Sequence, residues 1–509
     1  MEFQQDNRAF CAPQTVLNTV AEQLADVDFT LPDYCPDIEK ILKCTLSPQI
    51  RSKTLSGGLL QVDGTCTVSV LYVESAHKTI RCCEQSVEFS QSFTVRDAGE
   101  SPLVLTKTKP EYINCRALSP RRLVMHGAFS LYATVIAAKK TELFTPQEDN
   151  LEVLWKPLAI ADLQANCQEQ FTVSEEISVA DKPAIESVLY SKVGACVTDT
   201  KAAGGKLLLN GEISIRLFYL TNLETGETAK LDYLLPFTQM IDCEGIEDGA
   251  AVLTGCEVMN YDVRLKNDIL SDKPAVAFDA MLCVSVQGYQ AAERAVAADA
   301  YCTAFACAPS FAALAYTGSA KAVGETFIEK LTANIDSGKI SKVLDIYADN
   351  IALEAAPSEK GLTVRGKLSL CILALGEDSF PVFAERSCDF EHVLGDTEGC
   401  NALVFDSGAV PGVSYRLSDD NSIDIRCELK ISGGALQNGS VKAVCDVQLM
   451  EDRPLPPPEA ALTLYFASEG ERLWDIAKSH NTRLALLQTE NAVEGDVLGD
   501  DKMLLIPTL

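Results

Sequence analysis

The chain has few of the residues and spacings from which metal and catalytic sites are built. It contains only four histidines in 509 residues, His77, His126, His392 and His480, and they stand singly. No C-x-x-C pair occurs among its nineteen cysteines. Structural zinc needs four converging ligands, usually from paired motifs of that kind, so the spacing argues against such a site. With no nucleophile–base pair or phosphate loop evident, we predict no catalytic residue, no metal and no cofactor, and expect that the protein is not an enzyme.

Positive charge is also scarce. The sequence has 43 Lys and Arg against 72 Asp and Glu, a formal net charge of −29. This excess of acid argues against nucleic acid and anionic lipid headgroups as direct partners. The opening stretch, MEFQQDNRAFCAPQ, lacks the basic and apolar regions of a secretory signal. We therefore expect a cytoplasmic protein.

Long uninterrupted apolar runs are absent. The nearest is Ala295–Gly318, which Asp299 and Pro309 interrupt. It is no candidate for a bilayer span, which needs about 20 predominantly apolar residues. We interpret it as a buried segment that links two modules.

Cysteine itself is plentiful, but its placement does not indicate a disulfide framework. Many cysteines fall inside apolar alternating runs, among them Cys66, Cys283, Cys371 and Cys427. A free thiol in such a place acts as a small apolar side chain. In a reducing compartment we expect most of them to be unpaired.

One β-strand pattern occurs three times in the sequence. The copies are Gly58–Val73, Lys206–Thr221 and Lys360–Leu375, and each has one glycine at the same place, Gly64, Gly211 or Gly366. After the glycine, apolar and polar residues alternate, as in a strand with one buried face. The glycine favours a bend, a bulge or a close backbone approach. We expect each copy to be part of an antiparallel hairpin.

The similarity extends on both sides of this run. A phenylalanine recurs downstream at matching range, Phe89, Phe237 and Phe390, and each copy closes on another alternating run. Those closing runs are Leu123–Val135, Ala275–Val286 and Ile423–Ile431. Repetition on this scale indicates tandem whole domains.

These repeats predict a mainly β protein of three tandem antiparallel β modules followed by a small βααβ domain. We place the modules at residues 1–145, 146–292 and 293–452, a proline-rich linker at 453–460 and the last domain at 461–509. The modules are expected to lie end to end, and the linker to be an extended polyproline II spacer.

An acidic cluster near the start, Asp33, Asp37 and Glu39, has the composition of a metal or acid/base site. Asp37 follows a proline and precedes a short apolar turn, where an aspartate caps backbone N–H groups. In the second repeat Ala184 stands in its place. We therefore favour a capping role over catalysis.

The run LPDYCPDIEKIL, followed by the glycine-bearing strand, resembles the SPOCS domain of clostridial spore-coat and related proteins. The first copy is the closest to that pattern. The second keeps its frame in VADKPAIESVL, and the third, NIDSGKISKVL, has drifted. The resemblance implies three tandem SPOCS-like modules covering nearly all of the chain before residue 452.

The C-terminal stretch predicts a separate small unit. A short strand with Leu464 and Phe466 leads to a helix that places Leu473, Ile476, Ala477 and His480 on one face. A second helix with Leu484 and Leu487 follows, for which Thr482 is the expected cap, and Met503–Pro507 forms the last strand.

This order resembles a LysM domain, on the residues Gly470–Ala477, Asn491 and Leu504–Pro507. The resemblance implies a shallow groove between two loops that binds N-acetylglucosamine polymers. Carried over, the groove residues are Gly470, Glu471, Arg472, Leu473, Asn491, Ala492 and Val493. The chain has Glu471-Arg472 where the family has Asp-Thr or Asp-Ser, so the helix lacks its small capping hydroxyl. Trp474 is expected to pack in the core of the unit, because so small a domain needs each large apolar side chain.

Three SPOCS-like modules and a LysM resemble clostridial coat morphogenetic adaptors, which act in the mother-cell cytoplasm at the forespore surface and engage a coat ATPase. This resemblance implies a non-enzymatic assembly protein whose LysM engages that ATPase or another envelope protein. The alternative is a protein that binds an N-acetylglucosamine-containing glycan such as peptidoglycan.

Overall fold

The computed structural model describes residues 8–99, 101–266, 275–335, 338–419, 421–456 and 463–507. Apart from two short helices, its regular structure is strand, in agreement with the predicted class. Neither helix is long and apolar enough to cross a membrane, and no other helix occurs in these ranges.

The first module consists of two antiparallel sheets. One sheet has the order β3-β4-β5, and in the other β7 pairs with β1, β2 and β6. The strands are β1 Ala9–Leu24, β2 Val27–Thr30, β3 Ile38–Ser56, β4 Leu59–Glu74, β5 Ile80–Thr94, β6 Leu103–Ser119 and β7 Arg122–Glu142. The first strand of the module thus pairs with its last.

The second and third modules repeat this topology. Their sheets have the orders β9-β10-β11 with β12-β13-β8, and β15-β16-β17 with β14-β19-β18. The second module comprises β8 Leu151–Ser178, β9 Ser187–Ala203, β10 Lys206–Leu220, β11 Thr228–Asp242, β12 Ala251–Lys266 and β13 Ala275–Cys302. The third comprises β14 Phe305–Asn334, β15 Ile340–Ser358, β16 Gly361–Gly376, β17 Pro381–Val393, β18 Ala402–Asp419 and β19 Ser422–Pro454.

Each copy of the repeated pattern is one strand of an antiparallel hairpin, as expected. The copies form β4, β10 and β16, the central strand of a three-stranded sheet in each module. The predicted alternation is confirmed, since Val68, Val70 and Tyr72 are fully buried, as are their counterparts in the other two strands. The hairpin turns lie immediately before β4 and β10, at Gly57-Gly58 and Gly204-Gly205, where φ is positive at both residues of each pair.

The shared glycine and the shared phenylalanine are direct cross-strand partners. Gly64 pairs with Phe89, Gly211 with Phe237 and Gly366 with Phe390. A Cβ on Gly211 would lie 2.2 Å from the Phe237 ring and 2.6 Å from the carbonyl oxygen of Cys196. The other two glycines are equally covered by their phenylalanines. The close-approach interpretation of the glycine is therefore correct.

Each of these phenylalanines also reaches the opposite sheet. Phe89 meets Phe129 edge-on with ring centroids 5.0 Å apart. Phe237 meets Phe171 at 5.7 Å, and Phe390 meets Phe327 at 5.8 Å. The ring that covers the glycine is thus a contact between the two sheets in all three modules.

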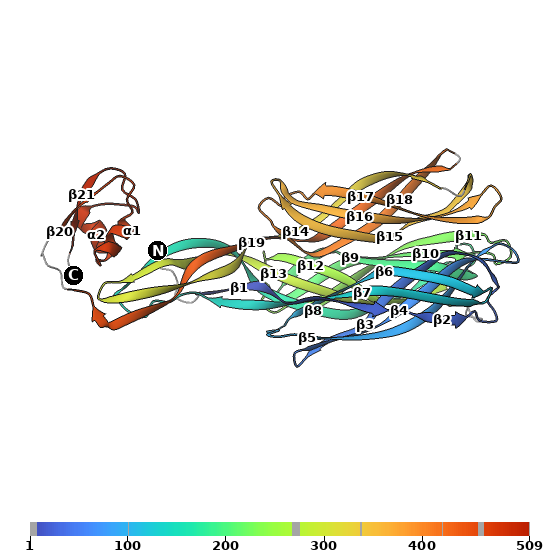
Figure 1. Ribbon diagram of the computed structural model, residues 1–509, viewed down its shortest axis with the longest axis horizontal. Helices are drawn as coiled ribbons and strands as arrows, with labels where there is room; N and C mark the ends of the chain where they lie inside the picture. Colours follow the sequence, from blue (N-terminus) through green and yellow to red (C-terminus); the bar gives the residue numbers. More distant parts are fainter. Residues whose placement is uncertain are drawn as a thin grey trace.

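The modules were expected to lie end to end, but they lie side by side, with the long axes of their strands aligned (Figure 1). One cluster combines Leu71 of the first module, Phe218 of the second and Leu373 of the third. These residues occupy equivalent places, each the same distance after its shared glycine. Because the three modules are related in fold, each one presents the same face to the other two, and the three contacts together form a closed arrangement.

An arm extends beyond the modules, and it consists of the start of β8, the end of β13, the start of β14 and the end of β19 (Figure 1). The segment Ala295–Gly318 links the second module to the third as expected, and Val296 and Ala300 in it are buried. It does so as strand, as the end of β13 and the start of β14 in this arm. Strand β13 continues past residue 292, the expected module boundary, because it pairs with β8 as far as Cys302 and Leu151. Phe10, Ile160 and Ala443 pack together at its base, one from each module.

The C-terminal unit contains β20 Thr463–Ala467, α1 Leu473–Ser479, α2 Leu484–Asn491 and β21 Lys502–Ile506. The proline-rich spacer predicted at 453–460 lies partly outside the described residues. Its first residues, Arg453 and Pro454, complete β19, and the Leu455 N–H donates to the carbonyl of Ala304.

The cysteines depart from expectation at one pair. Cys167 and Cys243 form a disulfide with Cα atoms 6.0 Å apart. The two residues are 76 positions apart, on β8 and just after β11, so no sequence spacing indicates the pair. The other seventeen are free thiols, as predicted for most.

Substitution of the shared glycine tests the Gly–Phe contact. We expect Gly211→Val to lower the free energy of unfolding by about 1–3 kcal/mol, because a side chain there overlaps both the Phe237 ring and the backbone. Urea unfolding measures it. Gly324→Val is the matched control, since a Cβ at that strand glycine meets nothing within 4 Å. Equal stability of the two variants would contradict the proposed contact.

Candidate functional site

The C-terminal unit is built around one small core. Leu473, Trp474, Ile476 and Ala477 of α1 are buried against Leu487, Leu498, Leu504 and Ile506. Trp474 is only 3% exposed, which confirms that it packs in the core and is not an open stacking surface.

The first predicted groove segment, Gly470–Leu473, is held mainly by backbone contacts. Gly470 has φ +86° and its N–H donates to Leu498, while Arg472 forms a β-bridge with Val497. The Glu471 carboxylate accepts a hydrogen bond from the Tyr465 hydroxyl at 3.2 Å. Leu473 is fully buried, so of these side chains Arg472 is the exposed one.

The second segment, Asn491–Val493, ends α2. The Asn491 amide donates to the carbonyls of Leu487 and Leu505 at 2.9 and 2.7 Å, and its oxygen accepts from the Leu505 N–H at 2.6 Å. Ala492 is left-handed at φ +48° and exposed, and Val493 is partly buried against the core. Asn491 therefore ties the helix to β21.

Neither helix has a side-chain cap. Arg472 and Arg483 occupy the N-cap positions without a capping hydrogen bond. The absence of a cap at Arg472 agrees with the sequence, but the cap expected from Thr482 is wrong. The Thr482 hydroxyl donates instead to the Pro507 carbonyl at 2.9 Å, and Thr482 is buried.

The unit rests on the tip of the arm. Tyr301 belongs to the core of the unit, its ring meets Trp474 edge-on at 4.9 Å, and its hydroxyl donates to the Thr482 carbonyl at 2.6 Å. Leu154 and Cys307 of the arm add apolar contact. The unit is thus docked, with the Trp474 side of α1 facing the arm.

Asp299 is the polar centre of this contact. Its carboxylate accepts a hydrogen bond from the Trp474 indole N–H at 2.9 Å and forms an ion pair with Lys478 at 2.7 Å. Burial raises the pKa of Asp299, but the hydrogen bonds from Lys478 and Trp474 outweigh it, so the pKa lies below its usual range. Asp299, which interrupts the apolar run in the sequence, therefore holds the C-terminal unit on the arm.

The opposite face of the unit is open and apolar. On the outer side of the β20–β21 sheet, Leu464, Phe466 and Met503 are 51%, 77% and 53% exposed. Leu464 pairs with the half-buried Leu505, and Phe466 with Met503, so the four side chains form one patch.

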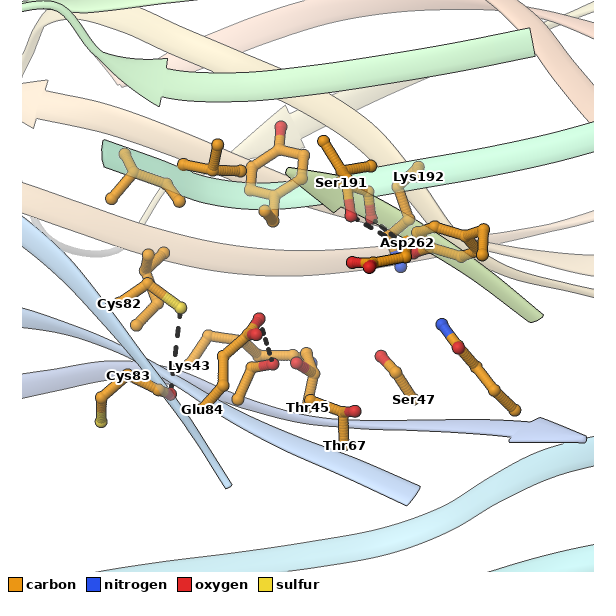
Figure 2. Close-up of a pocket in the computed structure, with 18 of the residues that line it drawn as sticks. Lys43, Thr45, Ser47, Thr67, Cys82, Cys83, Glu84, Ser191, Lys192 and Asp262 are labelled. Atoms are coloured by element: carbon orange, nitrogen blue, oxygen red, sulfur yellow. Dashed lines mark hydrogen bonds between the residues drawn. The ribbon is translucent and has the colours of Figure 1, made fainter. Parts of the chain in front are cut away.

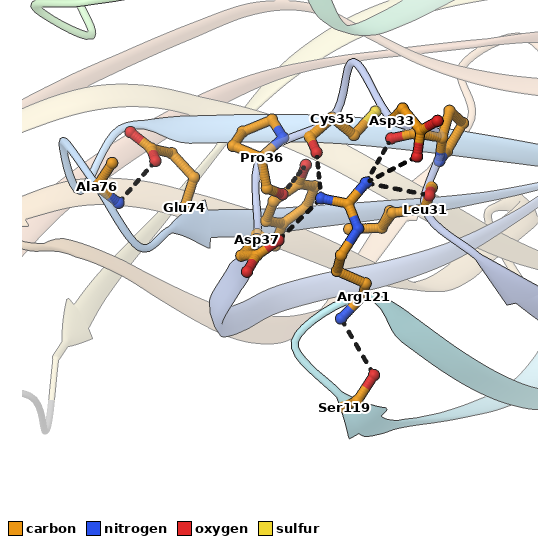
Figure 3. A network of polar contacts seen from close by, with 11 residues as sticks. Leu31, Asp33, Cys35, Pro36, Asp37, Glu74, Ala76, Ser119 and Arg121 are labelled. Atoms are coloured by element: carbon orange, nitrogen blue, oxygen red, sulfur yellow. Dashed lines mark hydrogen bonds and ion pairs between the residues drawn. The ribbon is translucent and has the colours of Figure 1, made fainter.

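The acidic cluster near the start of the chain is neutralised by cations (Figure 3). Asp37 does not cap backbone N–H groups but pairs with Arg121 at 2.8 Å, and the following residues begin β3. Arg121 also donates to the carbonyls of Leu31, Pro32 and Cys35, and its guanidinium lies 4.0 Å from Asp33. Glu39 pairs with Lys78. The cluster thus holds the loop between β2 and β3.

The same loop contains a contact that two modules share. The buried Tyr72 hydroxyl donates to the Pro36 carbonyl at 3.2 Å, and Tyr219 donates to the Pro183 carbonyl at 3.4 Å. Tyr72 and Tyr219 lie at equivalent places in β4 and β10. Residues 37–118 and 184–266 match the family model described as SipL, SPOCS domain.

The chain contains SPOCS domains.

The matched segments begin at Asp37 and Ala184, one residue after these prolines. The third module has the same topology as the two SPOCS segments although the family match does not include it. No curated protein and no solved structure matches the chain.

A third group of potential ligands lies where the modules meet. Asp349, Cys371 and Glu385 approach one another closely, and they are the one such group of metal-ligating type in the described ranges. Lys43 of the first SPOCS segment forms ion pairs with Asp349 at 3.8 Å and with Glu385, and Lys192 of the second pairs with Asp349 at 3.0 Å. Lysine side chains therefore neutralise these carboxylates.

Docking is tested by removing the charge of Asp299. We expect Asp299→Asn to weaken docking by about 1–2 kcal/mol, because the Lys478 ion pair is lost and the site is partly exposed. Trp474 fluorescence reports it in a Trp155→Phe background, shifting to longer wavelength as the indole meets water. Asp446→Asn, on an exposed arm residue, is the control. An unshifted spectrum in Asp299→Asn would contradict this role.

The depressed pKa of Asp299 also predicts a pH dependence. A carboxylate whose pKa is lower when docked stabilises docking at pH values above its ordinary pKa of about 3.9, and that contribution is lost as pH falls through the docked value. The wild type and Asp299→Asn should therefore differ in docking at pH 7, and the difference should shrink progressively as pH falls below about 4. A difference that persists in acid would exclude the ionised carboxylate as its source.

Proposed function

We propose that this protein is a non-enzymatic adaptor in spore-coat or envelope assembly, and that its C-terminal unit is a LysM-like module that engages a protein partner. Support for the sporulation context comes from the SPOCS match. In this proposal the protein acts in the mother-cell cytoplasm at the forespore surface, with a coat ATPase or another envelope protein as partner.

The exposed patch of Leu464, Phe466, Met503 and Leu505 carries the proposal. An apolar surface of this kind, rimmed by polar residues, is characteristic of protein–protein contact. It lies on the side of the unit that the arm leaves open, because docking uses Trp474 and Lys478. The arm therefore supports the patch at a fixed distance from the three modules.

The geometry of the expected groove supports a protein partner over a glycan. The Asn491 side chain is already hydrogen-bonded to Leu487 and Leu505, and Leu473 is buried. The Glu471 carboxylate accepts a hydrogen bond from the Tyr465 hydroxyl. The unit is also acidic, with eight Asp and Glu against four Lys and Arg between Glu469 and Lys502. Such a charge favours a partner whose binding site combines apolar and basic residues.

The test is binding of the full chain to a purified coat ATPase. We expect Leu464→Ser and Phe466→Ser each to weaken binding about tenfold or more, as for anchors at the centre of an interface. Leu234→Ser is the matched control, because Leu234 is 60% exposed on β11, away from the unit. Retained binding in both patch variants, or tight binding of muropeptides by the wild type, would contradict a protein-binding patch and favour the glycan alternative.

A further inference from the structure

The three junctions between the modules use the same positions of their central sheets. The cross-strand pair Thr45–Ser69 of the first module corresponds to Lys192–Arg216 in the second and Tyr347–Cys371 in the third. Each pair stands at the same distances from its shared glycine. Differences between the junctions therefore arise from the side chains at these places.

Large side chains fill the junction between the second and third modules. Lys192 pairs with Asp349 at 3.0 Å and its ammonium lies over the Tyr347 ring at 5.7 Å. Tyr190 donates to Asp345, and its ring lies 4.4 Å from that of Tyr347.

Between the third and first modules Lys43 fills the same role. It pairs with Asp349 and Glu385, and its ammonium lies 5.7 Å from the Phe383 ring. Lys40 stands similarly over Phe380 at 5.5 Å.

The junction between the first and second modules is hollow. A cavity of about 500 Å³ lies there, in the size range of small-molecule sites. Its floor is a row of small hydroxyl residues on β3 and β4: Thr45, Ser47, Thr67 and Ser69. Figure 2 shows Ser191, Lys192 and Asp262 of the second module facing this floor. Threonine and serine here are much smaller than the lysine and arginine of the second module, which leaves the space open.

The lysines that line the cavity are already paired with carboxylates. Lys43 and Lys192 bind the carboxylates of the third module, and Asp262 pairs with Arg264 at 2.9 Å. Glu84 accepts a hydrogen bond from Ser69 at 3.1 Å. An anionic ligand therefore finds no unpaired lysine here, and the row of neutral hydroxyl groups on the floor favours a neutral ligand.

Hydrogen-bonding groups and rings remain for such a ligand. Thr45, Ser47 and Gln49 line the cavity, and their side chains form no hydrogen bond with other residues of the described ranges. Hydroxyl groups both donate and accept, as the hydroxyls of a polyol do. Tyr34, 87% exposed, and Tyr261 add aromatic surface for the C–H faces of a sugar ring.

We propose that this cavity binds a small neutral polyhydroxylated molecule, a sugar or polyol, across the junction of the first two modules. Its hydroxyls exchange hydrogen bonds with the floor, and its ring lies against tyrosine. A bound molecule stabilises the contact between two modules that direct side-chain contacts leave incomplete at this place.

Saturation-transfer NMR on the full chain with glucose, mannitol and N-acetylglucosamine as probes tests this. We expect at least one to bind with a Kd of about 1 mM or tighter. Ser69→Arg, which introduces the residue found in the second module, should weaken that binding about tenfold or more. Ser56→Arg makes the same change at an exposed β3 residue outside the cavity and should bind as the wild type does.

Thermal unfolding of both variants verifies that they fold. Thr45→Tyr, which introduces the residue of the third module, provides a second way to fill the space and should act as Ser69→Arg does. Absence of a signal from all three probes, or equal signals from the wild type and both filling variants, would overturn the proposal. Equal signals would place the bound sugar elsewhere on the chain.

Discussion

The contact between a glycine and a phenylalanine on neighbouring strands is the constraint on which each module depends. The central strand carries a glycine because the phenylalanine opposite occupies the place of its side chain. The ring then reaches a second phenylalanine on the other sheet, Phe129, Phe171 or Phe327. Two sheets are thus joined through one aromatic side chain whose position the missing Cβ fixes.

Repetition of one module within a chain has a consequence for its assembly. Three bodies that present the same face to one another close into a group with buried junctions, as the cluster of Leu71, Phe218 and Leu373 shows. Once closed, the modules no longer need identical side chains at each junction. The chain uses lysine, tyrosine and carboxylates at two junctions and small hydroxyl residues at the third. The similarity is in the fold, and the differences between the copies provide room for separate roles.

The arm extends this arrangement to the C-terminal unit. A buried or half-buried carboxylate is favourable only when its hydrogen-bonding needs are met, and Asp299 meets them with groups that belong to the docked unit. The acid in an otherwise apolar strand thus makes docking specific to one orientation. That orientation leaves the apolar face of β20 and β21 turned outward.

Much of the fold follows from the sequence because it is local. The period of two in the repeated run, the matching glycines and the order of elements in the C-terminal unit all come from residues near one another in the chain. They predicted the strands, the threefold repetition and the burial of Trp474. The sequence also contained both halves of the Gly–Phe contact, but only the register of neighbouring strands showed that they meet.

What the sequence alone did not determine depends on residues far apart in the chain. The side-by-side packing of the modules, the Cys167–Cys243 bond and the pairing of Asp299 with Lys478 each join segments separated by dozens to hundreds of positions. Asp37 and Thr482 were assigned local capping roles because their distant partners, Arg121 and Pro507, were not visible. The sequence determined what each strand and module is, since periodicity acts over a few residues. Only the tertiary structure decided which faces meet, because that depends on the shape and charge of surfaces brought together by folding.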